Sequence, residues 1–197
     1  MINIAVFASG EGSNAENLFH YFSTSGKVKI KLVITNKEES GVVKKAEKHR
    51  KNIQIISKQT LEKYAEQFIE FLKSEKVDLI VLAGFLLKIP TALVAAFPNK
   101  IINLHPSLLP KFGGKGMYGM NVHQAVITSG EKESGITVHY VNEKYDEGEI
   151  ILQKKCVVEI FDTPETLAEK IKKLEHEYFP IAVQTIVEKL IDLKENN

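Results

Sequence analysis

The chain opens with the apolar run Ile2-Asn3-Ile4-Ala5-Val6-Phe7-Ala8, followed directly by Ser9-Gly10-Glu11-Gly12-Ser13-Asn14-Ala15. A short, nearly continuous apolar run is typical of a strand that is covered on both faces. The apolar residues Leu18, Phe19 and Phe22 follow at spacings that suit one face of a helix. This order of strand, glycine turn and helix predicts the first unit of an open α/β sheet.

The same alternation continues downstream. Runs rich in β-branched residues predict parallel strands at Ile2 to Ala8, Val28 to Thr35, Ile53 to Ile56, Asp78 to Ala83 and Lys100 to Leu104. The clearest helix between them spans Leu61 to Leu72, where apolar residues recur at i, i+3, i+4, i+7, i+8 and i+11.

The character of the chain changes after Leu104. A helix is expected at Val122 to Ser129, antiparallel strands at Gly135 to Val141 and Glu149 to Val158, and a last helical region from Asp162 onward with a frayed tail at Lys194 to Asn197. The fold class is therefore α/β, a Rossmann-like, mostly parallel sheet flanked by helices, with an antiparallel hairpin on its C-terminal side. Residues 1–197 are expected to form a single domain, because no linker or repeat interrupts them.

Composition narrows the function classes. The 26 basic and 25 acidic residues leave a net charge of +1, which gives no support for a nucleic-acid partner. No stretch reaches membrane-spanning length and no signal peptide is evident, so no membrane partner is expected. The lone Cys156, read as a strand residue, forms no disulfide within the chain, which favours a reducing, cytoplasmic location.

The glycine loop is the first candidate site. Glycines admit a close ligand, and the backbone N–H groups at Ser13 and Asn14 begin a helix whose dipole favours a phosphate. A tight turn without a ligand is the plainer alternative. The loop also matches the dinucleotide pattern G-x-G-x-x-G/A, but Thr35-Asn36-Lys37 stands where that fold needs an acidic residue. This absence argues against a dinucleotide-dependent dehydrogenase.

The second candidate site is Asn103-Leu104-His105, at the end of the last parallel strand. Alternate strand residues share a face, so the amide and the imidazole should lie side by side. Histidine exchanges protons near neutral pH and an amide binds a developing oxyanion, which together suit acyl transfer. A carboxylate from Asp146 would raise the pKa of His105 and keep it protonated. The alternatives are a structural histidine and a solvated turn at Asp146.

Two further predictions concern polar residues. Glu175 lies beside the apolar stripe of the last helix, where its carboxylate either reaches water or binds a polar ligand. The histidines show no H-E-x-x-H or other zinc spacing, so no metal is expected.

Four motifs in this order, together spanning essentially the whole chain, carry a resemblance: Ser9 to Asn14, Leu82-Ala83-Gly84-Phe85, Asn103-Leu104-His105-Pro106-Ser107-Leu108-Leu109-Pro110, and the hairpin at Asp146. The chain resembles the phosphoribosylglycinamide formyltransferases of the folate-dependent formyltransferase superfamily. The related methionyl-tRNA formyltransferases have a different first loop and an added domain, and formyltetrahydrofolate hydrolases carry an N-terminal regulatory domain. A non-catalytic nucleotide-binding module is the rival from another class, but it leaves Asn103, His105 and Asp146 unexplained.

The resemblance implies transfer of a formyl group from 10-formyltetrahydrofolate to glycinamide ribonucleotide in purine synthesis, with no metal, by a monomer or homodimer. It also implies residue roles. The catalytic residues would be Asn103, His105 and Asp146; substrate would contact Gly12, Ser13, Asn14 and Glu175; the folate would contact Leu86, Leu87, Lys88, Ile89, Asn103 and Val141.

Three features depart from the family pattern. Leu61 and Leu87 stand where many members have arginine near the folate. The loop from Lys111 to Gly119 is longer and richer in glycine, which suggests either a mobile flap near the ligand or a surface insertion.

Overall fold

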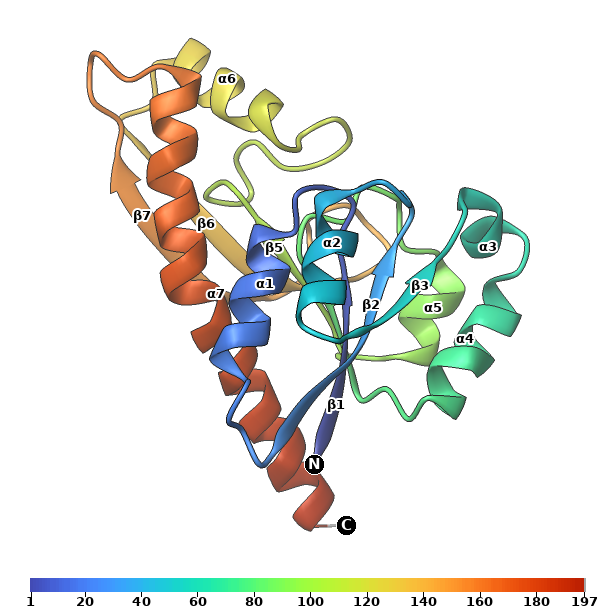
Figure 1. Cartoon of the computed structure of the whole chain (residues 1–197). Helices are drawn as coiled ribbons and strands as arrows, with labels where there is room; N and C mark the ends of the chain where they lie inside the picture. Colours follow the sequence, from blue (N-terminus) through green and yellow to red (C-terminus); the bar gives the residue numbers. More distant parts are fainter. Residues whose placement is uncertain (197) are drawn as a thin grey trace.

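The computed structural model describes residues 1–196, which form a seven-stranded sheet flanked by helices (Figure 1). The strands are β1 (Ile2–Phe7), β2 (Val28–Thr35), β3 (Asn52–Ile55), β4 (Leu79–Leu82), β5 (Ile101–His105), β6 (Glu133–Tyr140) and β7 (Ile150–Val157). Their order is β3-β2-β1-β4-β5-β6-β7; β1 to β5 pair in parallel, whereas β6 is antiparallel to both β5 and β7. The predicted fold class is confirmed, and each predicted strand lies within two residues of its observed ends.

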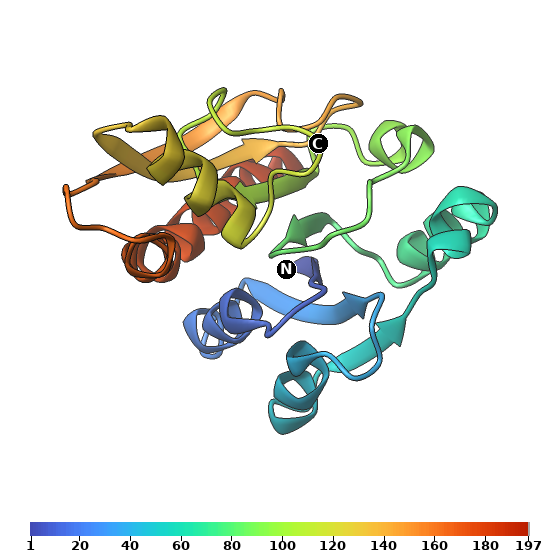
Figure 2. The same ribbon diagram turned by 90° about the horizontal axis from the view of Figure 1, so that it is seen from above.

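Helices cover both faces of the sheet (Figure 2). They are α1 (Ser13–Tyr21), α2 (Gly41–Lys48), α3 (Lys58–Glu62), α4 (Ala65–Ser74), α5 (Thr91–Ala96), α6 (Met120–Ser129) and α7 (Pro164–Glu195). Ile4 and Val6 of β1 pack with α1, α2, α6 and α7, whereas Ala5 and Phe7 pack with α3, α4 and α5. This alternation explains the uninterrupted apolar run, because each face of β1 meets its own layer of helices.

The predicted helix from Leu61 to Leu72 is wrong in one respect, since the structure divides it into α3 and α4. Ser57 caps α3 in a reciprocal capping box with Thr60, and Tyr64, at φ −119°, starts α4 separately. Leu61 and Leu72 nevertheless belong to the same apolar cluster. The apolar spacing persists across the break because both helices cover one face of the sheet.

Helix α7 runs the length of the sheet and begins as expected. Thr163 forms a capping box with Thr166, and Pro164 occupies the first turn, where its missing N–H costs nothing. The prediction of a frayed tail is wrong for Lys194 and Glu195, because both belong to α7 and the Lys194 ammonium lies 2.7 Å from a carboxylate oxygen of Asp78. Asn197 lies outside the described residues.

In the part of the chain that the structure describes, no helix is both long enough and apolar enough to span a bilayer.

Candidate active site

A cavity of about 600 Å³ opens at the carboxyl ends of the parallel strands, where open α/β sheets bind ligands. Its walls are the glycine loop, the segment from Leu82 to Ile89, the end of β5, the loop from Gly114 to Gly119 and the hairpin from Val141 to Asp146. All residues predicted for catalysis, substrate binding and folate binding line this cavity. The tertiary structure thus brings together residues as far apart in the sequence as Gly10 and Glu175.

The glycine loop has a backbone that only glycine fits. Gly12 has a φ of +70° at the N-cap of α1, and a Cβ built on it would lie 2.6 Å from Cβ of Val42. No side chain of the described residues caps α1. The N–H groups of its first turn therefore have no side-chain acceptor. Because Ser13 and Asn14 line the cavity, these groups can bind an anion there.

Asn14 and Glu175 join the glycine loop to α7. Nδ2 of Asn14 donates a 2.8 Å hydrogen bond to Oε2 of Glu175, while Oδ1 of Asn14 is buried and has no hydrogen-bond partner within residues 1–196. Burial raises the pKa of the Glu175 carboxyl, and the bond from Asn14 offsets this only in part. Of the two placements expected for Glu175, the structure supports the one at a ligand site.

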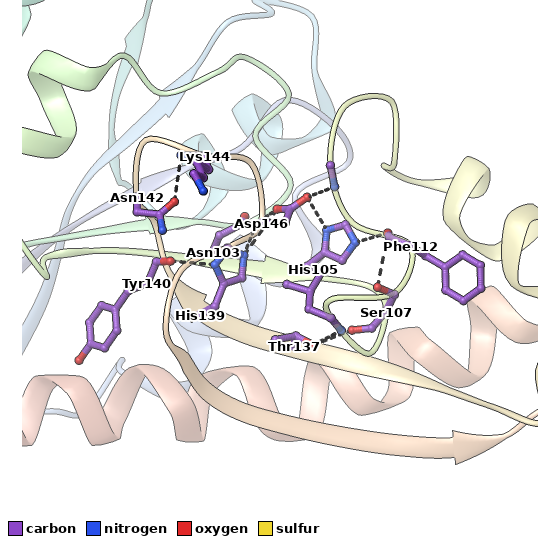
Figure 3. A network of polar contacts seen from close by, with 12 residues as sticks. Asn103, His105, Ser107, Phe112, Thr137, His139, Tyr140, Asn142, Lys144 and Asp146 are labelled. Carbon is purple, nitrogen blue, oxygen red and sulfur yellow. Dashed lines mark hydrogen bonds and ion pairs between the residues drawn. The ribbon is translucent and has the colours of Figure 1, made fainter.

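Asn103, His105 and Asp146 meet at the end of β5 (Figure 3). Nδ2 of Asn103 lies 3.4 Å from Oδ1 of Asp146, and Nδ1 of His105 lies 3.6 Å from Oδ2. Asp146 has a φ of +55°, and its Oδ2 accepts a 2.8 Å bond from the Gly114 N–H. Of the two alternatives for Asp146, the structure therefore supports a position beside His105 and Asn103 rather than a solvated turn.

The protonation of His105 follows from its partners. Its Nε2 lies 2.8 Å from the carbonyl oxygen of Phe112, which accepts only, so Nε2 carries the proton of the neutral ring. Nδ1 then faces Asp146 beyond hydrogen-bonding distance. It is left available to a ligand.

The expected rise in the pKa of His105 is wrong for the free site. Burial lowers this pKa, and the nearby Asp146 charge and the Phe112 carbonyl, which both raise it, do not compensate. Although burial raises the pKa of Asp146, the neighbouring imidazoles of His139 and His105 and the Gly114 N–H hold it below its usual value. The free site therefore pairs an ionised carboxylate with a mostly neutral imidazole at neutral pH.

His139 is a member of this group that the sequence analysis left without a role. The β5–β6 register places it opposite Asn103, with its Nε2 3.1 Å from Asn103 Nδ2 and its Nδ1 2.8 Å from the Tyr140 carbonyl oxygen. Because Nδ1 must donate to that carbonyl, Nε2 of the neutral ring accepts from Asn103. His139 thereby fixes which way the Asn103 amide points. The only sequence signal was a histidine in the strand next to β5, and it becomes informative once the register is known.

The cavity wall formed by the segment from Leu86 to Ile89 is largely apolar. Leu86, Leu87, Lys88 and Ile89 follow the turn after β4, and the Lys88 ammonium lies 5.3 Å from the centre of the Tyr145 ring in the hairpin. Leu61, which stands at a position of family arginines, is a buried residue of α3 and does not line the cavity.

The loop from Lys111 to Gly119 belongs to the site. Gly114, Met117 and Tyr118 line the cavity, and Gly114 holds Asp146. Of the two readings of this loop, a segment next to the ligand is therefore the one that the structure supports.

The fold is an open α/β sheet, and the glycine loop, Asn103, His105 and Asp146 line one cavity at its strand ends. This combination is typical of an enzyme that transfers a group at a carbonyl carbon. The formyl transferase family profile matches residues 2–183. The chain belongs to the formyl transferase family.

Individual relatives agree. The chain is 40% identical to the chloroplastic phosphoribosylglycinamide formyltransferase of Arabidopsis thaliana, over 98% of this chain and 68% of that protein. It is 37% identical to the Bacillus subtilis phosphoribosylglycinamide formyltransferase, over 95% of each. The crystal structure of the enzyme from Anaplasma phagocytophilum superimposes with a TM-score of 0.86 at 35% identity, covering 95% of this chain and 88% of that one.

Proposed function

We propose that the cavity transfers the formyl group of 10-formyltetrahydrofolate to the primary amine of N1-(5-phosphoribosyl)glycinamide. The products are the N2-formyl ribonucleotide and tetrahydrofolate, in the branch of purine biosynthesis that leads to IMP. This is the phosphoribosylglycinamide formyltransferase activity of the relatives. The observation that carries the proposal is that the glycine loop and the side chains of Asn103, His105 and Asp146 line one cavity.

The ribonucleotide end is assigned to the glycine loop. The backbone of Gly12, Ser13 and Asn14 binds the 5′-phosphate at the uncapped start of α1. The buried Asn14 Oδ1 and the Glu175 carboxyl are acceptors that face the same space. They suit the hydroxyl and N–H groups of the ribose and glycinamide, since a buried acceptor without a donor is costly.

The folate end is assigned to the apolar wall. Leu86, Leu87, Lys88 and Ile89 contact the folate, and its pterin lies against the backbone of the hairpin that starts at Val141. The polar backbone groups of the hairpin suit the polar edge of a pterin, while the leucines cover its faces.

In the reaction, the amine nitrogen attacks the formyl carbon and forms a C–N bond, giving a tetrahedral intermediate with an oxyanion. Nδ1–H of protonated His105 and one N–H of Asn103 stabilise that charge. Both N–H groups of Asn103 are occupied in the free site, and the longer bond, to Asp146, is the one that the oxyanion replaces.

Asp146 carries the proton that moves from the amine to the folate. It accepts the proton that the attacking amine releases and passes it to N10 of the folate as the C–N10 bond breaks. The oxyanion adds its charge to that of Asp146 beside His105, which favours the imidazolium that burial disfavours in the free site. His105 takes the proton of this imidazolium from solvent before the attack, keeps it on Nδ1 while the oxyanion exists, and returns it to solvent when the products leave.

The test is an assay of the purified protein with glycinamide ribonucleotide and 10-formyltetrahydrofolate, following the folate absorbance. Formylated ribonucleotide and tetrahydrofolate in equal amounts are expected. Absence of product with active folate donor would overturn the proposal. A rise in Tm with NAD(P) would instead favour the dinucleotide-dependent alternative.

We further propose that residues 1–197 act as one domain in the cytoplasm. The single sheet supports this, because both helical layers pack on it and share its strands. The unpaired Cys156 thiol fits a reducing compartment.

A further inference from the structure

Three metal-ligating side chains meet on the outer face of the α1 and α2 layer, away from the cavity. Glu16 and His20 are four residues apart on α1 and therefore share a face, and His49 is the C-cap of α2. One potential ligand atom from each lies within 4.8 Å of the other two. Nε2 of His49 is 3.3 Å from Oε1 of Glu16, and the rings of His20 and His49 are perpendicular with centres 4.7 Å apart.

We propose that Glu16, His20 and His49 form a binding site for one divalent transition-metal ion of the zinc class. Two imidazoles and one carboxylate are a donor set that Zn²⁺ accepts, with water completing a tetrahedron. The spacing along the chain hides this site, because Glu16 and His20 come from one helix and His49 from the end of the next. The site is independent of the formyl transfer reaction.

The packing around the cluster limits how far its members move. His49 contacts the ring of the buried Phe19, with centres 5.6 Å apart, and the His49 backbone N–H continues the hydrogen bonding of α2 by donating to the Lys45 carbonyl. Its side chain is 19% exposed, whereas His20 is on the surface. A metal ion would therefore meet two half-buried ligands and recruit the third by a rotation of an exposed side chain.

Two lysines compete with a cation for Glu16. The ammonium groups of Lys45 and Lys48 lie 3.5 and 3.4 Å from its carboxylate oxygens. Lys48 is 70% exposed and loses little by turning to water, while Lys45 stays near and opposes a second positive charge. A carboxylate of ordinary acidity is ionised at neutral pH, as a metal ligand must be.

A metal ion bound at this site would also stabilise the fold. The metal would cross-link α1 to the end of α2, and α1 is the nine-residue helix whose first turn carries Ser13 and Asn14. A ligand that binds only the folded state raises stability in proportion to the logarithm of its concentration above Kd. We therefore expect Zn²⁺ to raise Tm in the absence of substrate and folate.

Titration calorimetry with Zn²⁺, and the visible absorption of Co²⁺ as a probe of tetrahedral coordination, test the proposal on the full chain. Loss of one ligand in His20→Ala or His49→Ala should weaken binding by at least about tenfold and abolish the Tm shift. His176→Ala is the matched control, because it removes another exposed histidine outside the cluster. It should bind as the unchanged protein does.

Lys48→Ala gives the opposite test, since it removes a competitor for Glu16 and should bind Zn²⁺ more tightly. The exposed position of His20 makes His20→Ala a variant that folds, so a negative result remains informative. Equal Zn²⁺ affinity in the unchanged protein and in His20→Ala and His49→Ala would overturn the proposal and place any bound ion elsewhere, for example at His105 and His139. No binding to the unchanged protein at millimolar Zn²⁺ would overturn it as well.

Discussion

Nδ1 of His105 lies 3.6 Å from Oδ2 of Asp146, close enough for their charges to interact and too far for a hydrogen bond. Phe112 occupies the other ring nitrogen, and Gly114 holds the carboxylate. The imidazole and the carboxylate are thus each held by a partner other than one another. Because no hydrogen bond closes the pair, Nδ1 of the protonated ring can donate to the oxyanion.

Replacement of the catalytic side chains should lower turnover while the fold survives. We expect kcat to fall by about 10²-fold to 10⁴-fold in His105→Ala, Asn103→Ala and Asp146→Asn. Steady-state kinetics and circular dichroism measure the two effects. A His105→Ala enzyme with nearly unchanged kcat would refute the assigned role.

His139 is expected to act as a positioning residue through Asn103. In His139→Ala the amide loses the acceptor at 3.1 Å that orients it. We expect kcat to fall by about 10-fold to 100-fold, as when a supporting hydrogen bond is removed from a functional site. KM for the ribonucleotide should change little, because the polar contacts of the His139 ring are with Asn103, Tyr140 and Asp146 and not with the glycine loop. His139→Gln, which keeps an acceptor, should recover part of the activity, and a loss confined to KM would contradict this role.

The lowered pKa of His105 predicts how stability depends on pH. The unfolded chain, with a histidine pKa near 6.5, binds more protons than the folded chain below that value, so the free energy of unfolding falls as pH falls through 6.5. Its slope from this residue is at most about 1.4 kcal/mol per pH unit. Urea unfolding of His105→Asn between pH 7 and pH 5 should show a flatter dependence than that of the unchanged protein. An equal or steeper slope would show that His105 is not the group responsible.

Two glycines in one loop form a matched pair. Gly12→Ala places a Cβ 2.6 Å from Val42 at a φ of +70°, whereas nothing lies within 4 Å of a Cβ at Gly10. We expect Gly12→Ala to lower the free energy of unfolding by about 1–3 kcal/mol and to weaken ribonucleotide binding, because the loop must shift. Gly10→Ala should change stability by less than about 1 kcal/mol. Equal losses in urea unfolding would count against the crowding argument.

The phosphate loop predicts a preference for the phosphorylated substrate. Calorimetry should show tight binding of glycinamide ribonucleotide and much weaker binding of the dephosphorylated nucleoside. Glu175→Gln should weaken both about tenfold or more, because it replaces a carboxyl oxygen assigned to the part that the two ligands share. Equal affinities for the nucleotide and the nucleoside would show that the glycine loop does not bind the phosphate.

The repeated strand and helix pattern was enough to predict the sheet, its antiparallel end and the glycine turn, because period 2 and period 3.6 are local properties of the chain. The pairing of Asn103 with His105 was likewise local, since alternate strand residues share a face. The break between α3 and α4 was not predictable in this way, because both helices cover the same face and keep one apolar stripe.

The rest depended on contacts between distant segments. The register of β5 on β6 decided that His139 orients Asn103, and the burial produced by the closed fold decided that the pKa of His105 falls although Asp146 is beside it. The meeting of His20 with His49 has the same origin. The sequence by itself determined the fold class and the chemical groups of the site, and only the tertiary structure decided their partners and protonation, because desolvation and hydrogen bonding depend on neighbours that are remote along the chain.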